Sequence, residues 1–167
     1  MPDGLTHVLL GYVGVRRWIK GRRLTIFLLG CLMPDILLRG GRLLFLGNIQ
    51  RDFLELYLTP LHIPITSVFI CLALAQLFHS QIRRTAFKLL FGGCLAHFVA
   101  DLLQRTINGY GFTLERLDGY HWLYPFSWFD FQVGLYWTEE ASYALIFLIP
   151  LSLWPWITQE HRQRSDS

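Results

Sequence analysis

Five apolar stretches, separated by polar and turn-forming segments, dominate the pattern of the chain. They cover residues 5–19, 24–38, 63–78, 86–103 and 141–157. Apolar runs of this length predict helices that are buried in a protein core or surrounded by lipid. Several are shorter than the roughly 17–25 residues that usually cross a bilayer, so we expect local thinning of the bilayer or helices that extend beyond the apolar residues.

Composition favours the membrane. Hydrophobic residues make up 53% of the 167 residues and charged residues 16%, whereas an ordinary soluble domain is about 25% charged. We therefore predict an all-α protein, a polytopic membrane bundle of about five apolar helices. Its length predicts one helical membrane domain, residues 1–160, followed by a short polar cytoplasmic tail, residues 161–167. A soluble helical protein with buried helices is the competing interpretation. No cleavable signal peptide is expected, because the cations follow the first apolar stretch.

The charges are segregated. If the five stretches alternate in direction, ten of the 15 Lys and Arg residues fall on one side, together with only two of the 12 carboxylates. These cations are Arg16, Arg17, Lys20, Arg22, Arg23, Arg83, Arg84, Lys88, Arg162 and Arg164. The positive-inside rule makes that side cytoplasmic. We therefore expect a bacterial inner-membrane protein with its amino terminus outside and its carboxyl terminus in the cytoplasm.

A long segment, residues 104–138, separates the fourth and fifth apolar stretches on the extracytoplasmic side. It contains eleven Tyr, Trp and Phe residues. Segments of this length are usually functional or disordered, and the aromatic content argues against disorder. Since Trp and Tyr favour the headgroup level of a bilayer, the segment is either a lid across a site or an interfacial anchor.

Titratable residues beside the apolar stretches supply the candidate chemistry. His97 and Asp101, at i and i+4, share one face of a helix. Asp35 follows Pro34, which either kinks its helix, turning Asp35 inward and freeing main-chain carbonyls, or ends the helix in a turn. His62 lies between two prolines at a helix start, and His7 begins the first stretch.

All five side chains fall at the extracytoplasmic end, and ionisable groups in apolar segments are functional candidates. Imidazole and carboxylate are good zinc ligands, so the convergence predicts a divalent-metal site, although a helical His–Asp hydrogen bond or interfacial histidines would explain each residue alone. His121 is a further ligand candidate. Glu139 and Glu140 would supply a ligand or a general base, or would stabilise a helix start, and Asp3 is a weaker candidate.

Other residues are assigned no chemistry. His79 and His161 fall on the cytoplasmic side and are excluded from the site. Cys31, Cys71 and Cys94 form no CxxC pair, so we expect buried thiols rather than a disulfide framework. Gly92 and Gly93 predict a close helix approach. There is no phosphate-binding loop, nucleophile elbow or HExxH. The basic runs flank apolar stretches, so we expect them to determine the topology or to contact anionic lipids, not to bind nucleic acid.

The order of these motifs resembles the YdjM-like membrane-bound metal-dependent hydrolases over residues 5–127. In that family the segments read TH, PDID, HRGxTHS, GxxxHxxxD and LWPFS. Here they correspond to Thr6-His7, Pro34-Asp35, a segment from Leu61 to Ser67, Gly92 followed by His97 and Asp101, and Tyr124 to Ser127. The second acid of PDID and one histidine of HRGxTHS are replaced. The ligand order is also similar to that of zinc-dependent phospholipase C enzymes.

That likeness implies six successive metal ligands. They are His7, Asp35, His62, His97, Asp101 and His121. The expected function is a membrane-bound hydrolase of a phosphoester or lipid-like substrate, with zinc as cofactor and Asp35 or Glu140 as the proton acceptor. A non-catalytic metal-binding, transport or structural membrane protein with a degenerate site is the alternative.

Overall fold

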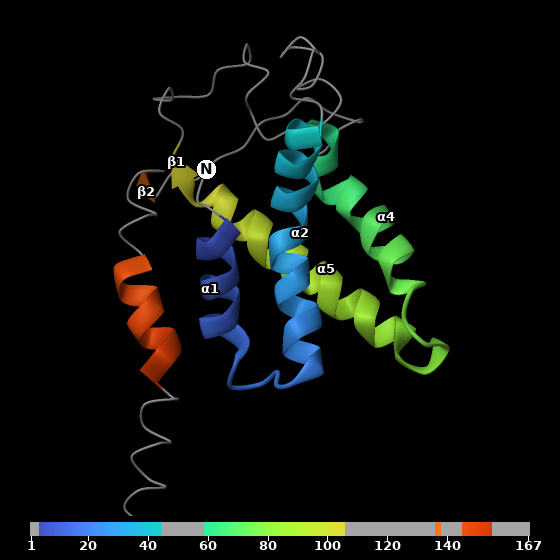
Figure 1. Cartoon of the computed structure of the whole chain (residues 1–167), viewed down its shortest axis with the longest axis horizontal. Helices are drawn as coiled ribbons and strands as arrows, with labels where there is room; N and C mark the ends of the chain where they lie inside the picture. Colours follow the sequence, from blue (N-terminus) through green and yellow to red (C-terminus); the bar gives the residue numbers. More distant parts are fainter. Residues whose placement is uncertain (1–3, 45–58, 106–135, 138–144, 155–167) are drawn as a thin grey trace, which may run out of the picture.

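The computed structural model is a bundle of helices (Figure 1). It describes residues 4–44, 59–105, 136–137 and 145–154. The elements are α1 (Gly4–Val15), α2 (Arg22–Leu44), the 3-10 helix η1 (Thr59–His62), α4 (Pro64–Ala75), α5 (Ser80–Leu102) and a short helix, Leu145–Trp154. Two-residue strands β1 (Gln104–Arg105) and β2 (Tyr136–Trp137) pair in parallel. The prediction of an all-α fold is confirmed, and each predicted apolar stretch corresponds to one helix.

Helix length separates α5 from the other apolar helices. Among the described residues, α5 alone is both long and apolar enough to cross a membrane. The helices α1, α4 and Leu145–Trp154 are apolar and shorter. Many large apolar side chains on the outside are exposed, including Phe69, Val99 and Phe147.

Proline 34 does not end its helix. The helix α2 continues to Leu44, so the turn considered for Pro34 and Asp35 is wrong, and this helix extends beyond its apolar stretch, one of the two outcomes expected for a short stretch. Because Pro34 has no N–H, the Gly30 carbonyl one turn earlier lacks its usual helical donor. The Cys94 thiol of α5 donates to that carbonyl at 3.3 Å. The helix therefore tolerates the proline because a neighbouring helix satisfies the freed acceptor.

The helices α2 and α5 touch through their backbones. A Cβ atom at Gly30 would overlap the carbonyl oxygen of Leu90, and one at Gly93 would overlap the carbonyl oxygen of Phe27. Gly92 has only ordinary space around it, with the Phe27 ring 3.7 Å from an added Cβ. Of the two glycines predicted to permit close approach, Gly93 does so, and its partner is Gly30.

The apolar core fills the space between α2, α4 and α5. Its members are Met33, Cys71, Leu90, Cys94 and Phe98. All three cysteines are buried and free, as expected. The Sγ atoms of Cys71 and Cys94 lie 3.6 Å apart.

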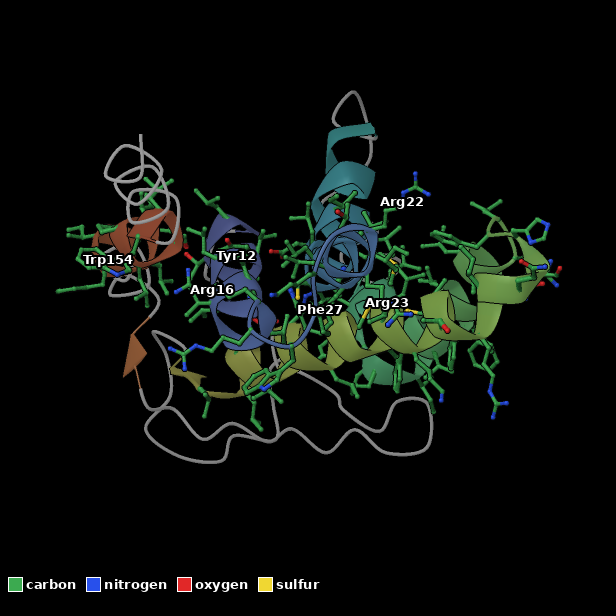
Figure 2. All side chains as sticks on the ribbon, turned by 90° about the horizontal axis from the view of Figure 1, so that it is seen from below. Tyr12, Arg16, Arg22, Arg23, Phe27 and Trp154 are labelled. Carbon is green, nitrogen blue, oxygen red and sulfur yellow. The ribbon has the colours of Figure 1, made fainter. Side chains whose placement is uncertain are left out.

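The two ends of the bundle differ in charge. The α1–α2 connection, the start of α2 and the start of α5 lie at the lower end of Figure 1, and together they carry eight Lys and Arg residues. Figure 2 looks onto this end, where Arg16, Arg22 and Arg23 are labelled. Arg16 donates to the carbonyl oxygens of Leu151 at 2.8 Å and Ser152 at 3.5 Å, which ties the helix Leu145–Trp154 to α1.

Candidate metal centre

Four elements bring five titratable side chains together near the other end of the bundle. His7 comes from the first turn of α1 and Asp35 from the middle of α2. His62 ends η1, and His97 and Asp101 lie one turn apart on α5. Each of the five residues is between 1% and 3% exposed. The structure thus assembles the five-residue set predicted from the sequence, which we call the His/Asp cluster.

Asp101 is the centre of the His/Asp cluster. Its Oδ1 lies 3.2 Å from Nε2 of His7, whereas its Oδ2 faces Nε2 of His97 at 3.1 Å and Nε2 of His62 at 3.5 Å. Asp35 approaches from the opposite side of His7, with its Oδ2 3.7 Å from Nδ1 of His7. Both ring nitrogens of His7 therefore face carboxylates.

The three imidazoles pack directly on one another. The rings of His7 and His97 stack with their centroids 3.9 Å apart. Nε2 of His62 lies 2.9 Å from Nε2 of His97. Phe98 meets the rings of His62 and His97 edge-on and closes one side of the His/Asp cluster.

A main-chain contact determines which ring nitrogen of neutral His97 carries the hydrogen. Its Nδ1 lies 2.8 Å from the carbonyl oxygen of Cys31. A carbonyl only accepts, so Nδ1–H is the donor, and the Nε2 of neutral His97 carries a lone pair. A histidine held in this way by an outer partner is the usual arrangement of a metal ligand.

The arrangement fits a divalent cation. Two sets, His7 with His97 and Asp101, and Asp35 with His62 and His97, each place one ligand atom per residue within 4.8 Å of the others. Asp101 Oδ2 is buried and makes no hydrogen bond of acceptable geometry within the described residues, although two imidazole nitrogens face it. A cation between these lone-pair-bearing atoms would satisfy them together. Imidazole and carboxylate favour zinc but do not identify it.

The environment of His62 also favours ligation. This residue lies in η1, ahead of the apolar helix α4. Burial lowers the pKa of its imidazole to about 4, although the Asp101 carboxylate acts in the opposite direction. His62 therefore stays neutral at neutral pH and keeps a lone pair for a metal ion.

The composition of the described chain makes this convergence unusual. Its only two carboxylates, Asp35 and Asp101, both belong to the His/Asp cluster, as do three of its four histidines. The fourth, His79, is exposed at the start of α5, where its ring accepts from the Gln81 N–H. Its exclusion from the site is confirmed.

Several predicted residues lie outside the described part of the chain. They are Asp3, His121, Glu139 and Glu140, together with most of the aromatic segment. The Cys31 carbonyl was not individually predicted. Only the packing of α2 against α5 brings this carbonyl to the His97 ring, so no local sequence signal points to it.

Comparisons with protein-family models, with curated proteins and with solved structures find no match to this chain. The resemblance to membrane-bound metal-dependent hydrolases therefore rests on the sequence motifs, and the geometry of the His/Asp cluster carries the functional argument.

Proposed function

We propose that the His/Asp cluster binds a divalent cation, zinc in the first place, and serves a membrane-bound hydrolase. The observation that carries the proposal is the convergence of three imidazoles and both described carboxylates from four elements onto one buried point. Burying so many ionisable groups in an apolar bundle is costly unless they are paired or coordinate a metal.

The residues of the His/Asp cluster have different roles in this proposal. His97, held by the Cys31 carbonyl, is common to both ligand sets and anchors the ion. His62 and Asp101 complete its immediate surroundings. Asp35, whose Oδ2 lies 3.7 Å from Nδ1 of His7, is the proton acceptor we favour for the attacking water. A bound zinc ion supplies a Lewis acid and lowers the pKa of water to near neutrality. Glu140, the other predicted base, lies outside the described residues.

The substrate class is inferred from the setting of the site. The outer surface of the bundle exposes large apolar side chains, and α5, which carries two of the five cluster residues, is apolar along most of its length. An amphiphilic phosphoester, such as a lipid with a phosphorylated headgroup, suits a polar site enclosed by such a surface.

We further propose that the cationic end faces the cytoplasm and the His/Asp cluster lies near the extracytoplasmic face of a bacterial inner membrane. Eight described cations gather at one end, and both described carboxylates belong to the cluster, away from that end. This distribution follows the positive-inside rule. Contacts of the basic end with anionic lipid headgroups are part of the proposal.

The first experiment measures metal content. Detergent-purified wild type is compared with the double variant His97→Ala/Asp101→Ala by elemental mass spectrometry, and His79→Gln is the matched control. We expect about one or more zinc ions per chain in wild type and in His79→Gln, and none in the double variant. Wild-type protein that takes up no metal on reconstitution would overturn the proposal.

Turnover is tested separately from metal binding. The zinc-loaded protein is assayed against phosphoester and phospholipid panels, with the metal-free protein as reference. A non-catalytic metal site is the alternative, and the nearly complete burial of all five side chains favours it, because closed sites are typical of structural zinc. Stoichiometric zinc without hydrolysis of any substrate would decide for that alternative.

A further inference from the structure

Ser67 is a fully buried hydroxyl in α4 whose Oγ has no hydrogen-bond partner among the described residues. A serine in an apolar helix commonly donates back to the carbonyl one turn earlier. Here the Ile63 carbonyl accepts the main-chain N–H of Ser67 at 3.1 Å, and the hydroxyl does not turn back to it. A buried polar group without a partner is unfavourable, and a bound ligand that accepts from this hydroxyl would remove that cost.

Two contacts locate Ser67 relative to the His/Asp cluster. One turn later on α4, Cys71 meets Cys94 of α5, with 3.6 Å between the Sγ atoms. Before α4, His62 meets His97 of α5, with 2.9 Å between the Nε2 atoms. The helices α4 and α5 run in opposite directions (Figure 1). Along α4, Ser67 therefore falls between the levels of these two contacts, one turn before Cys71.

The His/Asp cluster itself is poor in donors for an anion. Its carboxylates only accept, the one donor of neutral His97 is committed to the Cys31 carbonyl, and both ring nitrogens of His7 face carboxylates. The other buried polar side chains of the described ranges are the hydroxyls of Thr6 and Ser67. Thr6 already takes part in an interaction within the structure. The Ser67 hydroxyl is therefore a buried donor, without a partner among the described residues, that could donate to an oxygen of a bound ligand.

We propose that the Ser67 hydroxyl donates a hydrogen bond to a phosphoryl oxygen held at the His/Asp cluster. The inference rests on the proposed function and deepens it, because it assigns recognition of the phosphate class to one residue. No covalent step involves Ser67, which acts as a positioning residue for the ligand.

Inorganic phosphate is the probe. Its Kd for the zinc-loaded, detergent-solubilised full chain is measured by calorimetry for wild type, Ser67→Ala and Ser67→Thr. A hydrogen bond to a charged group predicts about a 10- to 100-fold weaker Kd in Ser67→Ala and a near wild-type Kd in Ser67→Thr. Cys71→Ala, one turn away on the same helix, is the packing control and should leave the phosphate Kd unchanged.

Stability and metal content separate this role from a structural one. A purely structural hydroxyl without a partner predicts that Ser67→Ala keeps its zinc, is as stable as wild type or more so, and binds phosphate equally well. Equal phosphate affinity, or zinc-loaded wild type that binds no phosphate, overturns the inference and leaves the metal centre standing. Wild type without zinc overturns the proposed function and this inference together.

Discussion

At the scale of single residues, proton placement alone can hold the His/Asp cluster together when no metal is bound. His7 Nε2–H donates to Asp101, and His97 Nδ1–H donates to the Cys31 carbonyl. The lone pair on His97 Nε2 is then free to accept Nε2–H of His62 at 2.9 Å. Because Nε2–H of His62 is already donating, a proton added to His62 goes to its other ring nitrogen and places a buried positive charge in the cluster. The metal-free cluster is therefore sensitive to acid.

We expect the metal-free protein to lose stability as the pH falls from about 6.5 towards 4. The folded-state pKa of His62 is about 4, below its ordinary value of 6.5, because burial disfavours the charged form. Between these values the unfolded chain binds a proton that the folded chain does not, so acid favours unfolding. At about 1.4 kcal/mol per pKa unit, the loss from His62 alone is on the order of 3 kcal/mol.

Thermal unfolding in detergent with chelator, measured at several pH values, checks this expectation. In His62→Gln the melting temperature should depend less on pH over the same range, because the residue no longer titrates. A wild-type profile as flat as that of His62→Gln would show that His62 takes up its proton over the same pH range in the folded and the unfolded protein.

At the scale of elements, the crossing of α2 and α5 depends on single glycines. Gly93→Ala should reduce stability by about 1–3 kcal/mol or more, because its Cβ would overlap the Phe27 carbonyl and push the helices apart. Gly92→Ala is the matched control. Its Cβ meets only the Phe27 ring at 3.7 Å, and alanine favours a helix over glycine by about 1 kcal/mol. The melting temperature should therefore fall in Gly93→Ala and rise in Gly92→Ala. Equal melting temperatures would contradict the close backbone contact.

The attachment of the helix Leu145–Trp154 depends on Arg16. Its guanidinium donates to the Leu151 and Ser152 carbonyls near the end of that helix and also lies over the Tyr12 ring, 5.6 Å from its centroid. Arg16→Ala should weaken the docking by about 1 kcal/mol, with Arg17→Ala, an exposed neighbour, as control. Limited proteolysis followed by mass spectrometry measures the release of the segment after residue 144. The attachment is disproved if both variants are cleaved at the wild-type rate.

Sequence reasoning succeeded where chemistry is local and failed where packing decides. The i,i+4 spacing was enough to pair His97 with Asp101, and alternation of the apolar stretches brought His7 and His62 to the same end. The sequence alone could not predict which of Gly92 and Gly93 lies at the helix contact, because adjacent helical positions differ only in the direction they face. Helix α2 continues through the polar and glycine residues after the apolar stretch 24–38 and ends at Leu44, which the hydropathy pattern did not predict. The missing partner of Ser67 is visible only in the packed structure.

At the scale of the whole molecule, the His/Asp cluster is the point where α1, α2, η1 and α5 meet, so a bound cation would cross-link all four elements. Binding to the folded state alone stabilises it by about 4 kcal/mol when free metal is 1,000 times Kd. Chelation should therefore lower the melting temperature of wild type and leave that of His97→Ala/Asp101→Ala unchanged.

Hydrogen exchange shows where that stabilisation acts. On chelation, the amides of α1, α2, η1 and α5 should exchange faster, because each element loses its anchor to the ion. The helix Leu145–Trp154 contributes no residue to the His/Asp cluster and is attached through Arg16, so its protection should change least. Equal loss of protection in all helices would mean that the chain unfolds as one unit without its metal. No change in any helix, in protein that had contained zinc, would place that ion outside the His/Asp cluster.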